Sequence, residues 1–207
     1  MLFRSVLELQ HRSNNLLAVI QSIAQRSLAD DQSKKTFEAR LQALARANRA
    51  LVRSNWGGVD LNQVVRNELE AFSKRASISG VSVLLSPQHA QNFTLALHEL
   101  ATNSAKYGAL SNTKGKVQVS WTIEPDQAGS VLKFKWKEIG GPPVSPPTRQ
   151  GFGSQLLNGI FSDVSLKYPV EGLRCDIAVH LVPARRRVSP QEPQAELSLQ
   201  DDAVVDG

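Results

Sequence analysis

The sequence predicts an α+β protein in which an N-terminal antiparallel helical hairpin precedes a sandwich of helices packed on a mixed β-sheet. Two observations predict this. Residues 2–53 contain neither Gly nor Pro and carry apolar side chains mostly three and four positions apart, which is the period of amphipathic helices. Beyond residue 60, helical patterns are interspersed with several short strand-like runs. That mixture favours one helical layer on a mixed sheet.

The hairpin is predicted from two helical segments, residues 2–28 and 33–53, with the polar stretch ADDQS between them. A short break between two long helices is typical of an antiparallel pair. Two helices alone bury little apolar surface, so we expect this hairpin, residues 1–55, to associate with a second copy as a dimeric four-helix bundle.

The second domain is expected over residues 60–183. It follows the stretch SNWGGVD, which has two glycines for a turn and offers Asp60 as a helix N-cap. The expected elements are a helix at 61–75, a strand at 81–85, a helix at 95–111, strands at 116–123 and 130–139, a helix at 153–162, and strands at 165–168 and 175–182. The polar residues 184–207 are expected to be a disordered tail.

Charge and composition restrict the partners. The chain of 207 residues has a net charge of +5, and its first 183 residues hold 21 basic and 14 acidic side chains, which favours anionic partners such as nucleotides. The basic residues are scattered, so no nucleic-acid partner is expected. The single cysteine, Cys175, excludes an internal disulfide and fits a reducing compartment. Without a signal peptide or a run of about eighteen apolar residues, we expect a cytoplasmic protein with no membrane association.

The first candidate site lies in the stretch LALHELATNSAKYGALS, residues 95–111. Glu99 and Asn103 are four positions apart, so they share one face of a helix and can point at the same ligand. Glu99 would supply a charged base and Asn103 a neutral oxygen donor. The simpler alternative for Glu99 is a salt bridge with an arginine or a lysine.

The second candidate is the loop WKEIGGPPVSPPTRQGFGSQLL, residues 136–157. Glycines at the start of a helix let backbone amides approach phosphate oxygens, and the helix N-terminus adds partial positive charge. Taken alone, a Gly-Phe-Gly sequence before a helix is more often a loop closure. The prolines are likewise compatible with a rigid linker.

Four ordered segments resemble the HWE-type sensor histidine kinases, a branch of the GHKL ATP-binding superfamily. The resemblance runs from about Leu7 to Pro183. ELQHRSNNLLAVIQSIA is similar to the phosphoacceptor box, and LALHELATNSAKYGALS to the N box with its distinguishing His98. WKEIGGPPVSPPTRQGFGSQLL resembles the merged glycine boxes, with the distinguishing Trp136 and Glu138, and GLRCDIAVHL the last strand. The resemblance implies a GHKL-type α/β sandwich after a dimerisation hairpin.

The resemblance also implies an ATP site and its residues. Asn103 is implied as the ligand of Mg²⁺, a hard cation that a carbonyl oxygen suits. Glu99 is implied as the general base, and Glu138 as the residue that reads the adenine amino group. Further nucleotide contacts are implied at Lys106, Tyr107, Gly140, Gly141, Arg149, Gly151, Phe152 and Gly153. His98 either orients the site or only packs, and Trp136 is expected to be mainly a core residue.

His11 is implied as the phosphoacceptor. It lies among polar residues in an otherwise apolar helix, and its near-neutral basicity makes an imidazole nitrogen a good nucleophile toward a phosphoryl group. The family usually has lysine where this chain has Asn14, which removes a charge near the incoming phosphate. Because only ten residues precede His11, we expect either a fragment of a longer sensor kinase or a separate sensor protein as partner.

The resulting expectation is a histidine kinase core. It would phosphorylate itself at His11 from Mg-ATP and pass the phosphoryl group to an aspartate of a response-regulator receiver domain. One alternative is a histidine phosphotransfer relay with the same fold and no ATP binding, against which Glu99, Asn103, Gly151 and Gly153 argue. A dimeric interaction scaffold without catalysis would leave these polar residues unexplained.

Overall fold

The computed structural model describes residues 30–54, 58–127, 129–147 and 151–181. The predicted first helix with His11, the predicted phosphate contact Arg149 and the tail from residue 184 lie outside the described residues. Phe152 is described through its backbone only. None of the described helices is both long enough and apolar enough to cross a membrane.

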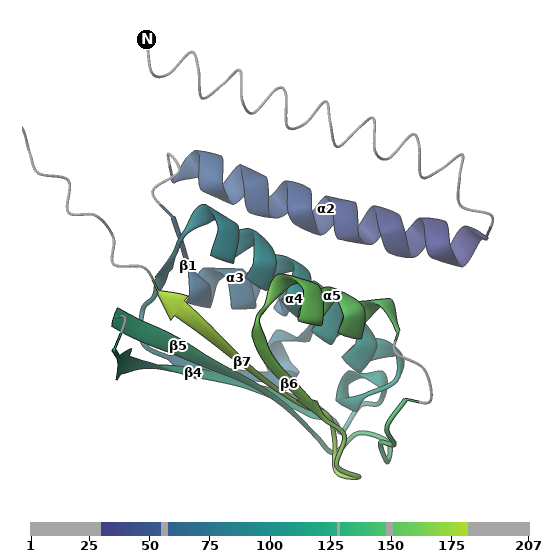
Figure 1. Ribbon diagram of the computed structural model, residues 1–207. Helices are drawn as coiled ribbons and strands as arrows, with labels where there is room; N and C mark the ends of the chain where they lie inside the picture. The colour runs from purple at the N-terminus through teal and green to yellow at the C-terminus, as the bar shows by residue number, and fades with distance from the viewer. Residues whose placement is uncertain (1–29, 55–57, 128, 148–150, 182–207) are drawn as a thin grey trace, which may run out of the picture.

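The described chain is layered (Figure 1). Helices α3 (Leu61–Glu68), α4 (Pro87–Lys106) and α5 (Phe152–Ile160) lie on one face of a β-sheet, and the long helix α2 (Asp31–Arg53) lies across α4 on the side away from the sheet. The α+β architecture with a mixed sheet is therefore confirmed. Of the predicted hairpin, only the second helix falls within the described residues, so the dimeric bundle stays a prediction.

The main sheet has the strand order β2-β4-β5-β7-β6. Its strands are β2 (Ala76–Gly80), β4 (Lys116–Asp126), β5 (Gly129–Ile139), β6 (Asp163–Lys167) and β7 (Arg174–Leu181). The β2 strand pairs with β4 in parallel, and every other neighbouring pair is antiparallel. Two short strands, β1 (Val59–Asp60) and β3 (Leu84–Leu85), form a separate antiparallel pair.

The core lies between the sheet and the helices. On β5, Leu132, Phe134 and Trp136 alternate toward the helical layer and are at most 1% exposed, as expected for every second residue of a strand. Phe93 of α4 packs edge-on against Phe134, with ring centroids 5.3 Å apart. This packing holds α4 against the strand that carries Glu138.

Helix α2 packs through a stripe of buried apolar side chains, two of which are alanines. Ala43, Ala47 and Leu51 follow one another at intervals of four residues and are at most 5% exposed, so they share one helix face. The helix starts after Asp30, whose carboxylate accepts a hydrogen bond from the Ser33 amide at 2.8 Å. The small residues let the α2 backbone come close to α4.

Helix α4 begins earlier and ends sooner than predicted. Ser86 caps its first turn and Pro87 occupies the first helical position, which together are a start signal. At the other end, the helix stops at Lys106, and residues 109–111 form the 3₁₀ turn η2 (Ala109–Ser111). The predicted bounds of 95–111 were therefore wrong at both ends, although the residues of interest do lie on the helix.

The segment after Asp60 also differs from the prediction. Asp60 is the N-cap of α3, as expected, and accepts from the Asn62 amide at 2.8 Å. The predicted helix 61–75 is divided, because α3 stops at Glu68 and residues 70–75 form the kinked 3₁₀ helix η1 (Glu70–Arg75). The edge strand β2 was missed because its sequence ASISG has only two apolar residues in alternation and follows directly on the predicted helix.

Candidate functional site

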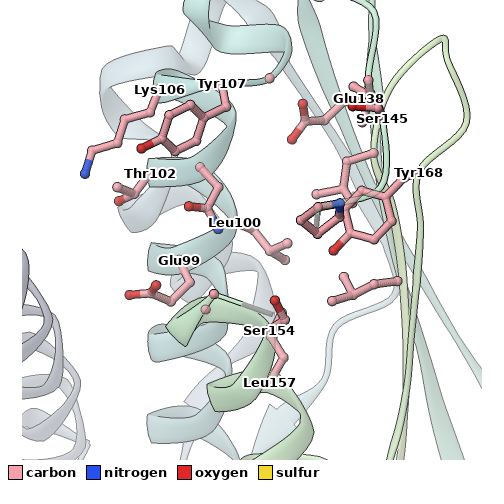
Figure 2. Close-up of a pocket in the computed structure, with 18 of the residues that line it drawn as sticks. Glu99, Leu100, Thr102, Lys106, Tyr107, Glu138, Ser145, Ser154, Leu157 and Tyr168 are labelled. Atoms are coloured by element: carbon pink, nitrogen blue, oxygen red, sulfur yellow. The ribbon is translucent and has the colours of Figure 1, made fainter. Parts of the chain in front are cut away.

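A pocket opens between α4, the start of α5 and the strand ends that carry Glu138 and Tyr168 (Figure 2). Its cavity volume is about 420 Å³, within the usual range for small-molecule sites. The structure brings seven of the predicted site residues to its lining: Glu99, Asn103, Lys106, Tyr107, Glu138, Gly151 and Gly153. Residues from two separate sequence motifs thus meet in one cavity.

Gly140 and Gly141 lie beside the pocket rather than in its lining. Gly140 has a φ of +72°, which favours glycine. A Cβ on Gly141 would lie 2.6 Å from the Cα of Ala109. The positive φ thus accounts for Gly140 and close packing against the turn after α4 accounts for Gly141. The contact of either glycine with a nucleotide stays a prediction.

One end of the pocket is formed by α4 and the start of α5. Glu99 and Asn103 lie one turn apart on α4, and a Cβ on Gly153 would be 3.2 Å from Glu99 Oε2 and 3.1 Å from Asn103 Nδ2. Glycine at 153 therefore allows α5 to approach both side chains. Gly151 is the N-cap of α5. Among the described residues, no side chain caps the backbone amides in the first turn of this helix. A helix N-terminus of this kind favours a phosphate group.

Glu99 is held by an arginine from α2. Arg40 donates from Nε to Oε1 at 2.5 Å and from Nη2 to Oε2 at 2.8 Å. The Glu99 side chain is only 6% exposed and that of Arg40 is 21% exposed. In Figure 2, Glu99 points to the side of α4 on which α2 lies. The sequence offered a salt bridge as the simpler alternative role for Glu99, and this salt bridge exists. Its carboxylate is buried, however, and Arg40 itself lines the pocket.

Glu138 lies on the opposite wall of the pocket, near its other end (Figure 2). It is 2% exposed. Its Oε2 accepts from the Ala109 amide at 2.7 Å, and its Oε1 accepts from Trp136 Nε1 at 3.2 Å. A Cβ on Gly108 would lie 2.0 Å from Glu138 Oε2. The carboxylate is thus fixed in direction by two donors and by close packing.

Trp136 therefore has two roles. The ring is 1% exposed in the core, as predicted, and its indole N–H also orients Glu138. Because residues two apart on a strand point to the same face, the spacing of these two residues places donor and acceptor together.

His98 lies outside the pocket lining. Its Nδ1 is 3.2 Å from Glu68 Oε2 on α3, and Glu68 also accepts from Arg46 of α2 at 3.0 and 3.1 Å. Burial raises the pKa of Glu68, but the hydrogen bonds from His98 and Arg46 together hold it below its ordinary value. His98 thus joins α4 to α3 and, through Glu68, to α2.

Sequence reasoning missed several lining residues, including Thr36, Arg40, Gly108, Ser145, Ser154 and Tyr168. Gly108 had a signal, because a glycine just after a helix commonly marks its end. Arg40 and Thr36 had none, since their place in the pocket depends on how α2 packs on α4. Tyr168 has a raised pKa, caused by burial and by nearby Cys175, with an opposing hydrogen bond from Ser154.

The fold is that of a histidine kinase domain. It matches the histidine kinase domain of the Erythrobacter litoralis EL346 blue-light activated histidine kinase with a TM-score of 0.55 and 15% identity, covering 86% of this chain and 91% of that domain. The larger EL346 structure matches with the same TM-score over 59% of its length. At this identity the likeness defines the fold alone.

Sequence comparison assigns the family. Residues 8–82 match the model of the HWE histidine kinases. A blue-light-activated histidine kinase of Brucella ovis is 34% identical over 189 residues, which cover 85% of this chain and 39% of the relative. The Brucella anthropi protein of the same name is 36% identical over 197 residues, with 89% and 40% covered. The chain belongs to the HWE histidine kinase family, a family of protein kinases, and spans about two-fifths of the length of these relatives.

Proposed function

We propose that this chain is a histidine kinase core that transfers the γ-phosphoryl group of ATP to His11 and then to an aspartate of a response-regulator receiver domain. The observation that carries the proposal is the single pocket that joins Glu99 and Asn103 of α4, Glu138 of β5 and the glycines at the start of α5. These residues come from separate motifs, and a structural role alone gives no reason for them to converge on a cavity.

The nucleotide is oriented because one end of the pocket suits adenine and the other end suits phosphate. Glu138 is a buried carboxylate with fixed direction, which suits it to accept from the exocyclic amine of adenine. At the other end, Gly151 and Gly153 start α5 beside Asn103, and a helix N-terminus suits phosphate oxygens. Lys106 and Tyr107 are exposed at the end of α4, where they can contact the nucleotide from the rim.

Asn103 is the residue that would hold Mg²⁺. Its side chain lines the pocket and is exposed, so its amide oxygen is accessible to a cation. Among the described residues no group of three or more His, Cys, Asp or Glu side chains is arranged for a metal ion. A Mg²⁺ ion held mainly by phosphate oxygens and water needs only one or two protein ligands. When bound, it would neutralise charge on the phosphates.

In the transfer step, an imidazole nitrogen of His11 forms a bond to the γ-phosphorus. The bond from that phosphorus to the β–γ bridging oxygen breaks, and ADP leaves with the electron pair. Glu99 accepts the proton of the imidazole. The phosphoramidate keeps the phosphoryl group reactive, so an aspartate of a receiver domain can take it in the next step. A homodimer is the form in which we expect the hairpin to present His11.

Labelling with ATP tests this function. The purified chain, incubated with γ-labelled ATP and Mg²⁺, is expected to carry an acid-labile, base-stable label that moves to a receiver domain. His11→Gln is expected to remove the label and leave nucleotide binding nearly unchanged, because the pocket is built by other residues. Circular dichroism checks that this variant keeps its helices.

Two results would overturn the proposal. Wild-type protein that takes phosphoryl groups from a phosphorylated receiver domain but never from ATP would be a phosphotransfer relay. A label that maps to the peptide containing His98, under alkaline conditions, would show that a different histidine is the acceptor.

A further inference from the structure

We propose that Arg40 of α2 is a catalytic residue that the hairpin supplies to the nucleotide pocket, an inference that rests on the function proposed above. In the described conformation its guanidinium group binds Glu99. When the triphosphate is in place, the same group binds the γ-phosphoryl oxygens instead. This exchange releases Glu99 to act as the base only when the group to be transferred is present.

The Arg40–Glu99 pair restricts access to Glu99. Both carboxylate oxygens accept from the guanidinium, at 2.5 and 2.8 Å, and the Glu99 side chain is only 6% exposed. A general base needs an oxygen within hydrogen-bond reach of the proton that it removes. Arg40 occupies the side of Glu99 that faces α2 (Figure 2), so the guanidinium has to move before an imidazole carried by the hairpin can reach that side of the carboxylate.

The charges of the pocket lining indicate that an anionic ligand would compete with Glu99 for Arg40. Among the described lining residues the cations are Arg40 and Lys106, and the carboxylates are Glu99 and Glu138. The described lining is therefore neutral overall, although its proposed ligand carries several negative charges. Arg40 is bonded directly to Glu99 at the end of the pocket where α5 begins, so it is the described cation placed nearest to the phosphate end.

A guanidinium group suits this exchange because its planar donor fork matches phosphate oxygens as well as it matches a carboxylate. One two-pronged ion pair is broken and another is formed, so Arg40 does not become an unpaired buried charge. Positive charge placed on the γ-phosphoryl oxygens also stabilises the negative charge spread over them in the transition state.

A different role for Arg40 would be a simple restraint that keeps Glu99 inactive while α2 is docked. The two roles predict opposite effects, because removing a restraint raises the rate of phosphorylation and removing a catalytic residue lowers it. A third possibility is that Arg40 only holds α2 against α4. A matched control on the same helix, Arg46, distinguishes that structural role from a catalytic one. Arg46 also pairs across to a buried carboxylate, Glu68, but it lies outside the nucleotide pocket.

The test compares nucleotides that differ by the γ-phosphate. The full chain is titrated with Mg-ADP and with a non-hydrolysable Mg-ATP analogue. Arg40→Ala is expected to weaken the ATP analogue about tenfold to a hundredfold more than ADP, the worth of a hydrogen bond to a charged group. Arg40→Lys should recover part of that difference, because it keeps the charge but loses the fork. Arg46→Ala should leave the ratio of the two affinities unchanged.

A second variant tests the exchange itself. Glu99→Gln removes the carboxylate that competes for Arg40, so it is expected to bind the ATP analogue at least as tightly as wild type while autophosphorylation is lost. In Arg40→Ala the autophosphorylation rate at saturating ATP should fall more than tenfold.

Several outcomes would overturn the role of Arg40 alone. They are an equal loss of affinity for both nucleotides, an unchanged rate, or a faster rate in Arg40→Ala, each measured against a wild-type chain that binds ATP and becomes labelled. A wild-type chain that does neither would instead overturn the proposed function, and with it this inference.

Discussion

Glu138 illustrates how much of the site depends on single atoms. Its Oε2 accepts from the Ala109 amide and its Oε1 from the Trp136 indole, and a Cβ on Gly172 would lie 2.3 Å from its backbone oxygen. A buried carboxylate is costly unless its oxygens accept hydrogen bonds. The glycines and the tryptophan around Glu138 therefore serve to keep a charged group buried and pointing in one direction.

Gly108→Ala tests this dependence on close packing. The added methyl group would meet Glu138 Oε2 at 2.0 Å, so the carboxylate has to move and lose a donor. We expect the variant to lose about 1–3 kcal/mol of unfolding free energy, as overpacking usually does, and to bind ATP much more weakly. Urea denaturation and nucleotide titration measure the two effects.

The matched control for this variant is Gly159→Ala. A Cβ on Gly159 meets nothing within 4 Å, and alanine is favoured over glycine in a helix by up to about 1 kcal/mol. The control should therefore be as stable as wild type or slightly more stable. A Gly108→Ala protein with wild-type stability and ATP affinity would show that Glu138 does not need its described position.

At the scale of elements, the packing of α2 on α4 connects the hairpin to the nucleotide pocket. Arg40 reaches Glu99, and Asn48 accepts from Gln91 of α4 at 2.6 Å. Between these polar contacts, Ala43 and Ala47 are buried. The small side chains set how close the helices come, and that distance decides whether Arg40 can reach the pocket.

Ala43→Leu is expected to separate α2 from α4. Ala43 is 0% exposed, so three additional carbon atoms have no room there. Overpacking of this kind costs about 1–3 kcal/mol, and the displaced helix would withdraw Arg40 from Glu99. Chemical denaturation measures the loss of stability, and the selectivity for the ATP analogue over ADP should fall as it does in Arg40→Ala.

Gln42→Leu provides the control on the same helix, because Gln42 is exposed. Surface substitutions usually change stability by no more than about 0.5 kcal/mol. Similar effects of Ala43→Leu and Gln42→Leu would contradict the close packing of α2 on α4.

At the scale of the whole molecule, polar contacts tie three helices together. Glu68 of α3 accepts from Arg46 of α2 and pairs with His98 of α4, and the Arg40–Glu99 pair lies further along α2. The main sheet lies on the other side of the α4 layer (Figure 1). The stability of the layered arrangement therefore depends on the ionisation of groups that lie between its helices.

This dependence predicts a loss of stability in acid. The folded-state pKa of Glu68 lies below its ordinary value of 4.5, so its carboxylate stabilises the fold fully above that value. The contribution is lost as the pH falls through the lowered folded-state pKa. We expect wild type to be more stable than Glu68→Gln at neutral pH and the difference to shrink toward zero in acid.

Unfolding free energies from urea titrations at a series of pH values measure that difference. Arg46 stays charged throughout the range, so its bond to Glu68 is lost only when the carboxylate is protonated. A difference between Glu68→Gln and wild type that stays constant with pH would show that the charge of Glu68 is not what stabilises the three helices.

Local patterns in the sequence determined a large part of this protein. The period of four in α2 and the alternation along β5 predicted both elements nearly to their ends, because each pattern reports one buried face. Asp60 was recognised as a helix cap by its position before an apolar run. The family resemblance placed Glu99, Asn103 and Glu138 in one site, and the structure brings these three to one cavity.

Only the tertiary structure decided which residues from other elements meet these side chains. The choice of Arg40 as the partner of Glu99, and of Glu68 as the partner of His98, depends on how α2, α3 and α4 pack. The short alternation in β2 was likewise too weak to predict a strand by itself, since its parallel pairing with β4 and the close approach of Gly80 to Trp121 are long-range contacts. Spacing along the chain reports which side chains share a face, but the partner across that face is chosen by contacts between segments that are distant in sequence.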